Sequence, residues 1–150
     1  MKLAEALQER SDLNRRIEQL RYRLSMNATV QEGEKPAEEP NELIKELDAC
    51  VARLGELIAR INLTNAKTEI EGKTLTELIA KRDTLTVKLN AYRDLVSGAS
   101  NVVSRATRSE IKILPTVNVK KLQKQVDDMS KELRLTDNAI QQANWVNELM

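Results

Sequence analysis

Residues 43–61, LIKELDACVARLGELIARI, decide the fold of this chain. The main apolar residues of the stretch follow one another in steps of four and three: Leu43, Leu47, Cys50, Leu54, Leu57 and Ile61. This spacing is typical of a helix that meets a partner helix along one seam. Ile44, Val51 and Ile58 add a second apolar row, one residue after the first. Because this row widens the apolar stripe, we expect the helix to contact two or more neighbours.

The same rhythm recurs in three other segments. We expect a first helix over residues 3–26, a third over 75–96 and a fourth over 119–143, while the 43–61 helix begins near Asn41. Thr74 and Glu77 have the spacing of a capping box, which predicts the start of the third helix, and Gly98 predicts its end.

Two segments interrupt the helical pattern. Residues 27–40, NATVQEGEKPAEEP, combine prolines, a glycine and four glutamates, and so predict an acidic connector that is longer than usual between packed helices. The sequence leaves open whether it crosses the molecule, carries a function or is mobile. Residues 101–115 contain short β-branched runs around Thr107–Ser109, which predict a small β-hairpin.

Composition agrees with a helical protein. Aromatic residues make up 2% of the 150 residues, and only four glycines and three prolines are present, which favours few, long elements. We therefore predict a mainly all-α fold in which four long amphipathic helices form an antiparallel bundle or a coiled-coil-like arrangement. A small β-hairpin is expected between the third and fourth helices. We expect a single domain over residues 1–150.

The residue inventory narrows the function classes. The chain has no histidine and a single cysteine, Cys50, which argues against zinc hydrolases, His-based triads and internal disulfides. We predict no catalytic residue, no metal site and no cofactor, and enzymatic activity is left open with a leaning against it. A secretion signal and an apolar run long enough to span a bilayer are both missing, so we expect a cytoplasmic protein that does not insert into membranes.

Arginines stand at two seam positions that should be apolar, Arg10 and Arg82. A guanidinium between aliphatic layers needs a carboxylate, a bound anion or a route to water, because desolvating an unpaired ion is costly. Either these arginines bury their aliphatic stems while their guanidinium groups reach water, or they belong to a polar ligand pocket. The candidate ligand-binding residues are Arg10, Asn14, Asn62, Asn65, Arg82 and Asp83.

Three further features allow two interpretations each. Asn62 and Asn65 either hold a polar ligand or, with Thr64, end their helix by bonding its last carbonyls. Trp145 either anchors a subunit interface or caps the internal core. A basic cluster either contacts phosphate or has a solvated, edge-protecting role: Arg105, Arg108, Lys112, Lys120, Lys121 and Lys124. Because this cluster lacks the stacking aromatics of nucleic-acid modules, we predict no specific nucleic-acid partner.

Several strings resemble a family of small bacterial helical proteins labelled septicolysin: ALQERSDLNRRIEQLRYRL, VQEGEKPAEEP, RINLTNAKT, EGKTLTELIAKRD and IQQANWVNELM. The resemblance spans nearly the whole chain and implies a helical, largely uncharacterised bacterial protein. The label implies a cytolysin, whereas the chain lacks the strongly basic, aromatic-rich amphipathic helix expected of interfacial insertion.

We therefore predict a helical interaction or structural protein that associates with itself as a homo-oligomer. The alternative is a small-ligand or anion-binding protein, or an enzyme, that uses the polar seam pocket. A membrane-damaging cytolysin is the third hypothesis.

Overall fold

The structure is a computed structural model that describes residues 1–101 and 111–150. Four long helices account for most of it, which confirms the predicted all-α class: α1 (Leu3–Met26), α2 (Pro40–Lys67), α3 (Leu75–Ser100) and α5 (Val119–Val146). The chain divides into two compact units, residues 1–69 with 143–150 and residues 70–142, and each is described by itself.

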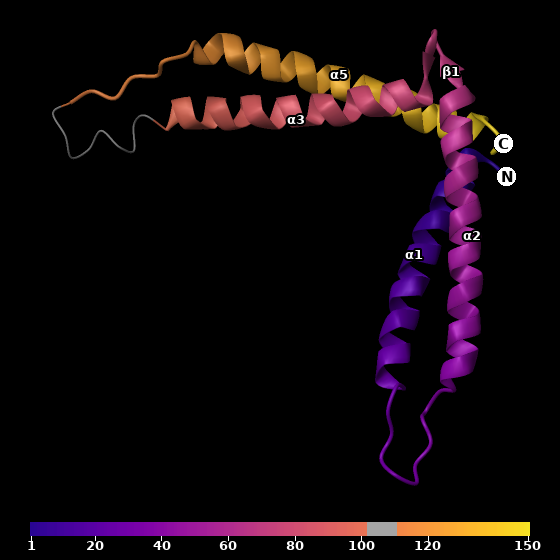
Figure 1. Ribbon diagram of the computed structural model, residues 1–150. Helices are drawn as coiled ribbons and strands as arrows, with labels where there is room; N and C mark the ends of the chain where they lie inside the picture. The colour runs from indigo at the N-terminus through magenta and orange to yellow at the C-terminus, as the bar shows by residue number, and fades with distance from the viewer. Residues whose placement is uncertain (102–110) are drawn as a thin grey trace. The chain divides into compact units, whose positions relative to one another are not determined.

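In the first unit, α1 and α2 lie side by side as an antiparallel helical hairpin (Figure 1). Leu20, Leu43 and Cys50 are buried in its seam. Four partly buried aliphatic side chains pack around them: Leu13, Ile17, Leu24 and Leu47. The rhythm of three and four in both helices therefore builds an apolar seam between residues 13–24 and 43–50, as the sequence predicted.

The acidic connector joins α1 to α2 at one end of this hairpin. The backbone amide of Glu38 donates to the Asn27 side-chain oxygen at 2.9 Å, and Arg23 forms an ion pair with Glu38. Asn27 also donates from its side-chain amide to the carbonyl of Arg23. The two ends of the connector are thus held together, so it is a returning loop rather than a crossing.

The opposite end of the hairpin holds both termini. Lys2 and Glu148 form an isolated antiparallel β-bridge, and the Lys2 ammonium lies 2.7 Å from the Glu148 carboxylate. The backbone amide of Met150 donates to the Thr64 hydroxyl at 3.0 Å. Residues far apart in the sequence thereby close the end of the unit.

The second unit is built from a small hairpin and a helix pair. Strands β1 (Glu69–Ile70) and β2 (Lys73–Thr74) are joined by Glu71 and Gly72, which both have positive φ angles, as tight two-residue hairpin loops require. Thr74 then caps α3, and its hydroxyl accepts from the Glu77 amide at 3.2 Å, which confirms the predicted capping box.

Helices α3 and α5 lie side by side within this unit (Figure 1). Leu89, Val126 and Met129 are buried between them. Leu85, Tyr92, Val96 and Leu133 pack against this cluster. Polar pairs continue the contact toward the start of α3, among them Lys81 with Glu132 at 2.8 Å.

The observed β-hairpin stands between α2 and α3, not between the third and fourth helices where the sequence predicted one. Residues 102–110 of the predicted hairpin lie outside the described residues, and 111–118 contain no strand. The strands at 69–74 are only two residues each, so β-branched enrichment could not reveal them. The glycine of the Glu71-Gly72 pair, where both residues have positive φ angles, was the sequence feature that could have indicated this turn.

Candidate functional site

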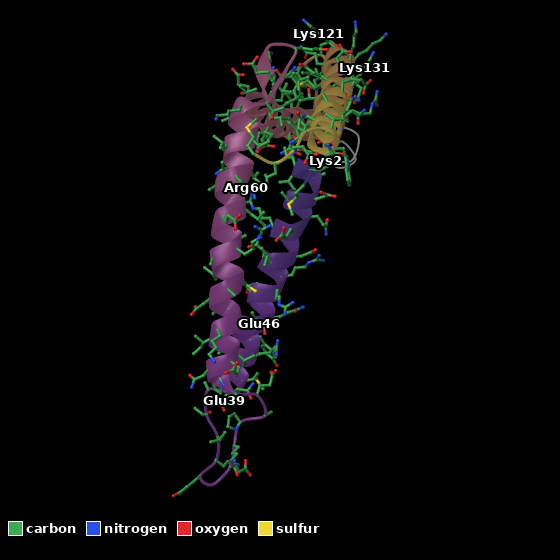
Figure 2. The ribbon with its side chains drawn as sticks, turned by 90° about the vertical axis from the view of Figure 1, so that its right-hand side faces the viewer. Lys2, Glu39, Glu46, Arg60, Lys121 and Lys131 are labelled. Atoms are coloured by element: carbon green, nitrogen blue, oxygen red, sulfur yellow. The ribbon has the colours of Figure 1, made fainter. Side chains whose placement is uncertain are left out.

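One side of the α1–α2 hairpin carries its ion pairs between helices. Arg53 of α2 donates to both carboxylate oxygens of Glu9 on α1, at 2.7 and 2.9 Å. A second ion pair lies farther along the same side, where Arg16 Nε of α1 donates to Glu46 of α2 at 2.7 Å. Figure 2 labels Glu46 on α2. Because Glu9 and Arg16, like Glu46 and Arg53, are spaced by seven residues, they follow one flank of each helix. We call this side the ion-paired face.

The charges of this face stabilise one another. The hydrogen bonds from Arg53 lower the pKa of Glu9, against a smaller opposing effect of desolvation. The hydrogen bonds from Arg23 likewise lower the pKa of Glu38 at the connector. Arg53 itself has a raised pKa, because it bonds Glu9 and also Glu56 on its own helix. All of these groups are therefore charged at neutral pH.

The opposite side of the same hairpin has a different chemistry, which helical periodicity locates. Residues two positions apart in a helix point about 200° apart, so the residues two before Glu9, Arg16, Glu46 and Arg53 lie on the other flank. These are Leu7, Asn14, Ile44 and Val51. We call this side the open face; its residues are Leu7, Arg10, Asn14, Ile44, Asp48, Val51, Gly55, Ile58 and Asn62.

The open face exposes apolar side chains. Ile44 and Val51 are 44% and 50% exposed, and Ile58 is half-buried. This is the second apolar row of the 43–61 stretch, which we expected to contact a further neighbour. Within the first unit α2 packs against α1 and, around Thr64, against the C-terminal segment, and both leave Ile44 and Val51 exposed.

Gly55 lies beside this row in the middle of α2. It is exposed, and no atom lies within 4 Å of the place where its Cβ would stand. A glycine inside a helix costs roughly 1 kcal/mol relative to alanine. Nothing in the described part of the chain therefore requires this glycine.

The predicted ligand-binding residues of the first unit are spread along the hairpin. Arg10 is half-buried, and no ion pair or hydrogen bond joins its guanidinium to the described residues. Asn14 is exposed one turn later on α1. Asn62 is exposed and Asn65 half-buried near the far end of α2, so these four residues do not converge on one pocket within the unit.

Asn62 and Asn65 do not end their helix, which was the second of their two interpretations. Helix α2 continues to Lys67. The neighbouring Thr64 is buried, and its hydroxyl donates to the Arg60 carbonyl at 2.9 Å while accepting from the Met150 amide. Thr64 therefore joins α2 to the C-terminal segment, which lies 86 residues away in the sequence.

The other two candidate residues, Arg82 and Asp83, are in the second unit. Arg82 Nε donates to Asp83 at 2.9 Å, and a second guanidinium nitrogen lies 3.7 Å from Asp137 on α5. The Arg82 side chain is 31% exposed, so its head group reaches the surface, where two carboxylates neutralise it. The pair is therefore a partly hydrated link between α3 and α5.

The structure also places Trp145 and part of the basic cluster. Trp145 is 62% exposed, so it does not cap the internal core, and the adjacent Val146 is exposed as well. In the basic cluster, Arg105 and Arg108 lie outside the described residues. Lys121 lies in the first turn of α5, where its backbone amide donates to the side-chain oxygen of Asn118, the residue that caps the helix. Across residues 1–101 and 111–150, no group of three or more acidic or cysteine side chains is placed to hold a metal ion.

A hollow of about 550 Å³ lies on the second unit between the β1–β2 hairpin, α3 and α5. Its charged lining comprises Glu71, Lys73, Lys81, Asp128, Lys131 and Glu132. The Lys81 ammonium is already bound to Glu132, and the hydrogen bond from Lys81 lowers the pKa of that carboxyl. Because three of these lining residues are acidic and three are basic, the hollow favours no one class of ionic ligand.

The sequence alone did not single out Asp48 or the Glu9–Arg53 pair. Their signal was the seven-residue spacing of charges on each flank, which becomes readable once the register of α1 against α2 is known. In the part of the chain that the structure describes, no helix is long and apolar enough to cross a membrane.

Comparison with known proteins gives two matches. A protein family described as a family of unknown function (DUF6847) matches residues 10–149. A crystal structure of a functionally unknown conserved protein from Corynebacterium diphtheriae is 41% identical, with a TM-score of 0.92, and the match covers 100% of this chain and 99% of that one. No curated protein matched the chain. Neither match carries the septicolysin label that the resemblance suggested.

Proposed function

Because the chain belongs to the DUF6847 family of unknown function, we propose a function from its own surface: a helical interaction protein that associates with itself. The observation that carries this proposal is the uncovered apolar row of the open face, Ile44, Val51 and Ile58. Apolar area that a chain leaves in water favours association, since each Å² removed from water contributes about 25 cal/mol.

The exposed indole of Trp145 supports the same proposal. Large aromatic side chains are enriched at the energetic centres of protein interfaces. Trp145 is exposed beside Val146, and both belong to the first unit, as the open face does. We propose Trp145 as a second apolar contact with the partner chain.

The test is the molar mass in solution, measured by size-exclusion chromatography with light scattering. The wild type should be an oligomer at micromolar concentration, and a chain carrying both Ile44→Glu and Val51→Glu should have a lower mass. Val87→Glu is the matched control, because Val87 is 72% exposed on α3 and lies outside the open face. A wild type that stays monomeric overturns the proposal.

A second candidate function is binding of a small anion. Arg10 favours it, because this half-buried guanidinium has no carboxylate partner among the described residues, and Asn14 lies one turn away. A ligand that binds only the folded state raises its melting temperature. Phosphate should therefore raise the melting temperature of the wild type and leave Arg10→Leu unaffected. No rise at millimolar phosphate would count against this candidate.

The remaining predicted pocket residues, Asn62, Asn65, Arg82 and Asp83, enter the same experiment as single alanine variants. Membrane damage, which the septicolysin resemblance implies, is not part of the proposal. Leakage of dye from liposomes on adding the wild-type chain would favour it.

A further inference from the structure

The open face carries two charges in its central part, and they are opposite in sign. Arg10 lies on α1 and Asp48 on α2, and no ion pair or hydrogen bond engages either side chain within the described residues. By contrast, Glu9 and Arg53 on the ion-paired face are fully engaged within one chain. The open face thus presents one unpaired positive and one unpaired negative group.

The register of the hairpin fixes where these two groups stand along its axis. The pairs Arg53–Glu9 and Arg16–Glu46 show that residue n of α1 lies level with about residue 62 − n of α2. Arg10 is therefore level with position 52. Asp48 is four residues away, which is about 6 Å along a helix with a rise of about 1.5 Å per residue.

This arrangement is complementary to itself. A two-fold axis that crosses the open face at right angles to the helices, close to Val51, reverses the direction of the hairpin in the second copy. It brings Arg10 of each copy within two residues, or about 3 Å, of the level of Asp48 of the other. The same operation places Val51 opposite its own symmetry mate and Ile44 opposite Ile58. Self-complementarity of this kind is what a two-fold interface requires.

We propose that the occupant of the open face is a second copy of this chain, packed antiparallel with α2 over α2 and joined by two Arg10–Asp48 ion pairs. This inference rests on the self-association proposed above and specifies its geometry. The apolar row supplies the buried area, and the charges fix the register of the two copies. Gly55 has no side chain, so it permits the two α2 helices to approach closely, although its own chain leaves room for a side chain there.

Charge reversal tests this geometry in the full-length chain. Arg10→Asp places two negative groups on the face and Asp48→Arg places two positive groups, so each variant alone should dimerise at least roughly tenfold more weakly than the wild type. A mixture of the two variants restores both opposite-charge contacts and should dimerise like the wild type. Helix content by circular dichroism verifies that each variant is folded.

Cross-linking gives an independent readout if a charge variant does not fold. In a Cys50→Ser background, Val51→Cys should form an intermolecular disulfide on mild oxidation, because the two-fold axis passes close to this position. Ala49→Cys is the matched control on the other side of α2 and should stay unlinked.

The outcomes separate this inference from the proposed function. Two weakened single variants, a rescued mixture and a Val51→Cys cross-link support it. A wild-type oligomer whose mass is unchanged by both reversals, or whose Val51→Cys chains do not link, overturns the inference and leaves self-association standing. A wild type that is monomeric at every concentration overturns both.

Discussion

The Arg53 guanidinium donates to both carboxylate oxygens of Glu9, at 2.7 and 2.9 Å, and so joins α2 to α1 near the middle of their hairpin. Each side chain is about one-third exposed. A two-pronged arrangement of this kind is stronger than a single surface contact because it fixes orientation as well as distance. It also marks the face of the hairpin that is already satisfied within one chain.

Glu9→Gln should lower the melting temperature, since it removes the charge from this contact. The loss should shrink at high salt, because the ion pair is partly exposed and therefore screened. Glu18→Gln is the matched control: Glu18 pairs with Arg21 on the same helix, and both are well exposed. Thermal melts at low and high salt measure the effect. Equal shifts for the two variants would contradict the assigned role of Glu9.

Stability should fall in acid. The pKa values of Glu9, Glu38 and Glu148 lie below the ordinary value of 4.5, chiefly through side-chain hydrogen bonds from Arg53, Arg23 and Lys2, respectively. Between the lowered pKa values of the folded chain and the ordinary pKa of the unfolded chain, the unfolded chain therefore binds more protons than the folded chain. The stabilisation is fully present above pH 4.5 and is lost as the pH falls toward the folded-state pKa values. Urea midpoints measured from pH 7 down to pH 3 test this; a flat profile would contradict it.

Leu20→Ala should destabilise the first unit by about 2–4 kcal/mol, because it removes a fully buried side chain and leaves a cavity. Leu89→Ala should have a similar effect in the second unit. Leu135→Ala, at an exposed leucine, should change the free energy of unfolding by less than about 0.5 kcal/mol. Urea unfolding followed by circular dichroism supplies the three values. Equal losses in all three would contradict the assigned cores.

Glu71→Asn should stabilise the chain by roughly 0.5 kcal/mol. Glu71 has a φ angle of 50°, which asparagine tolerates better than glutamate, and Asn-Gly is the favoured pair for a two-residue hairpin loop. Gly72→Ala should destabilise it by about 1 kcal/mol, because Gly72 has a φ angle of 78°. Differential scanning calorimetry checks both signs, and a destabilised Glu71→Asn variant would refute the turn assignment.

Much of the fold followed from local rules. The steps of three and four located all four helices, and the Thr74–Glu77 capping box gave the start of α3 because both partners lie within one turn. Helix ends were harder to predict. Asn62 and Asn65 have the chemistry of a helix end, yet α2 continues to Lys67. Thr64 between them bonds Met150, a contact that no local pattern encodes.

The candidate site was only partly predictable. The second apolar row of α2 was visible in the sequence, whereas the division of the hairpin into an ion-paired face and an open face was not. That division depends on which residue of α1 lies level with which residue of α2. The Glu9–Arg53 and Arg16–Glu46 pairs supply this register, and they join residues 44 and 30 positions apart.

Sedimentation equilibrium of the wild-type chain, over a range of micromolar concentrations, decides whether the chain associates with itself. Self-association requires a mass that approaches twice the 17.0 kDa of one chain and falls on dilution. A mass that stays at 17.0 kDa throughout would contradict it.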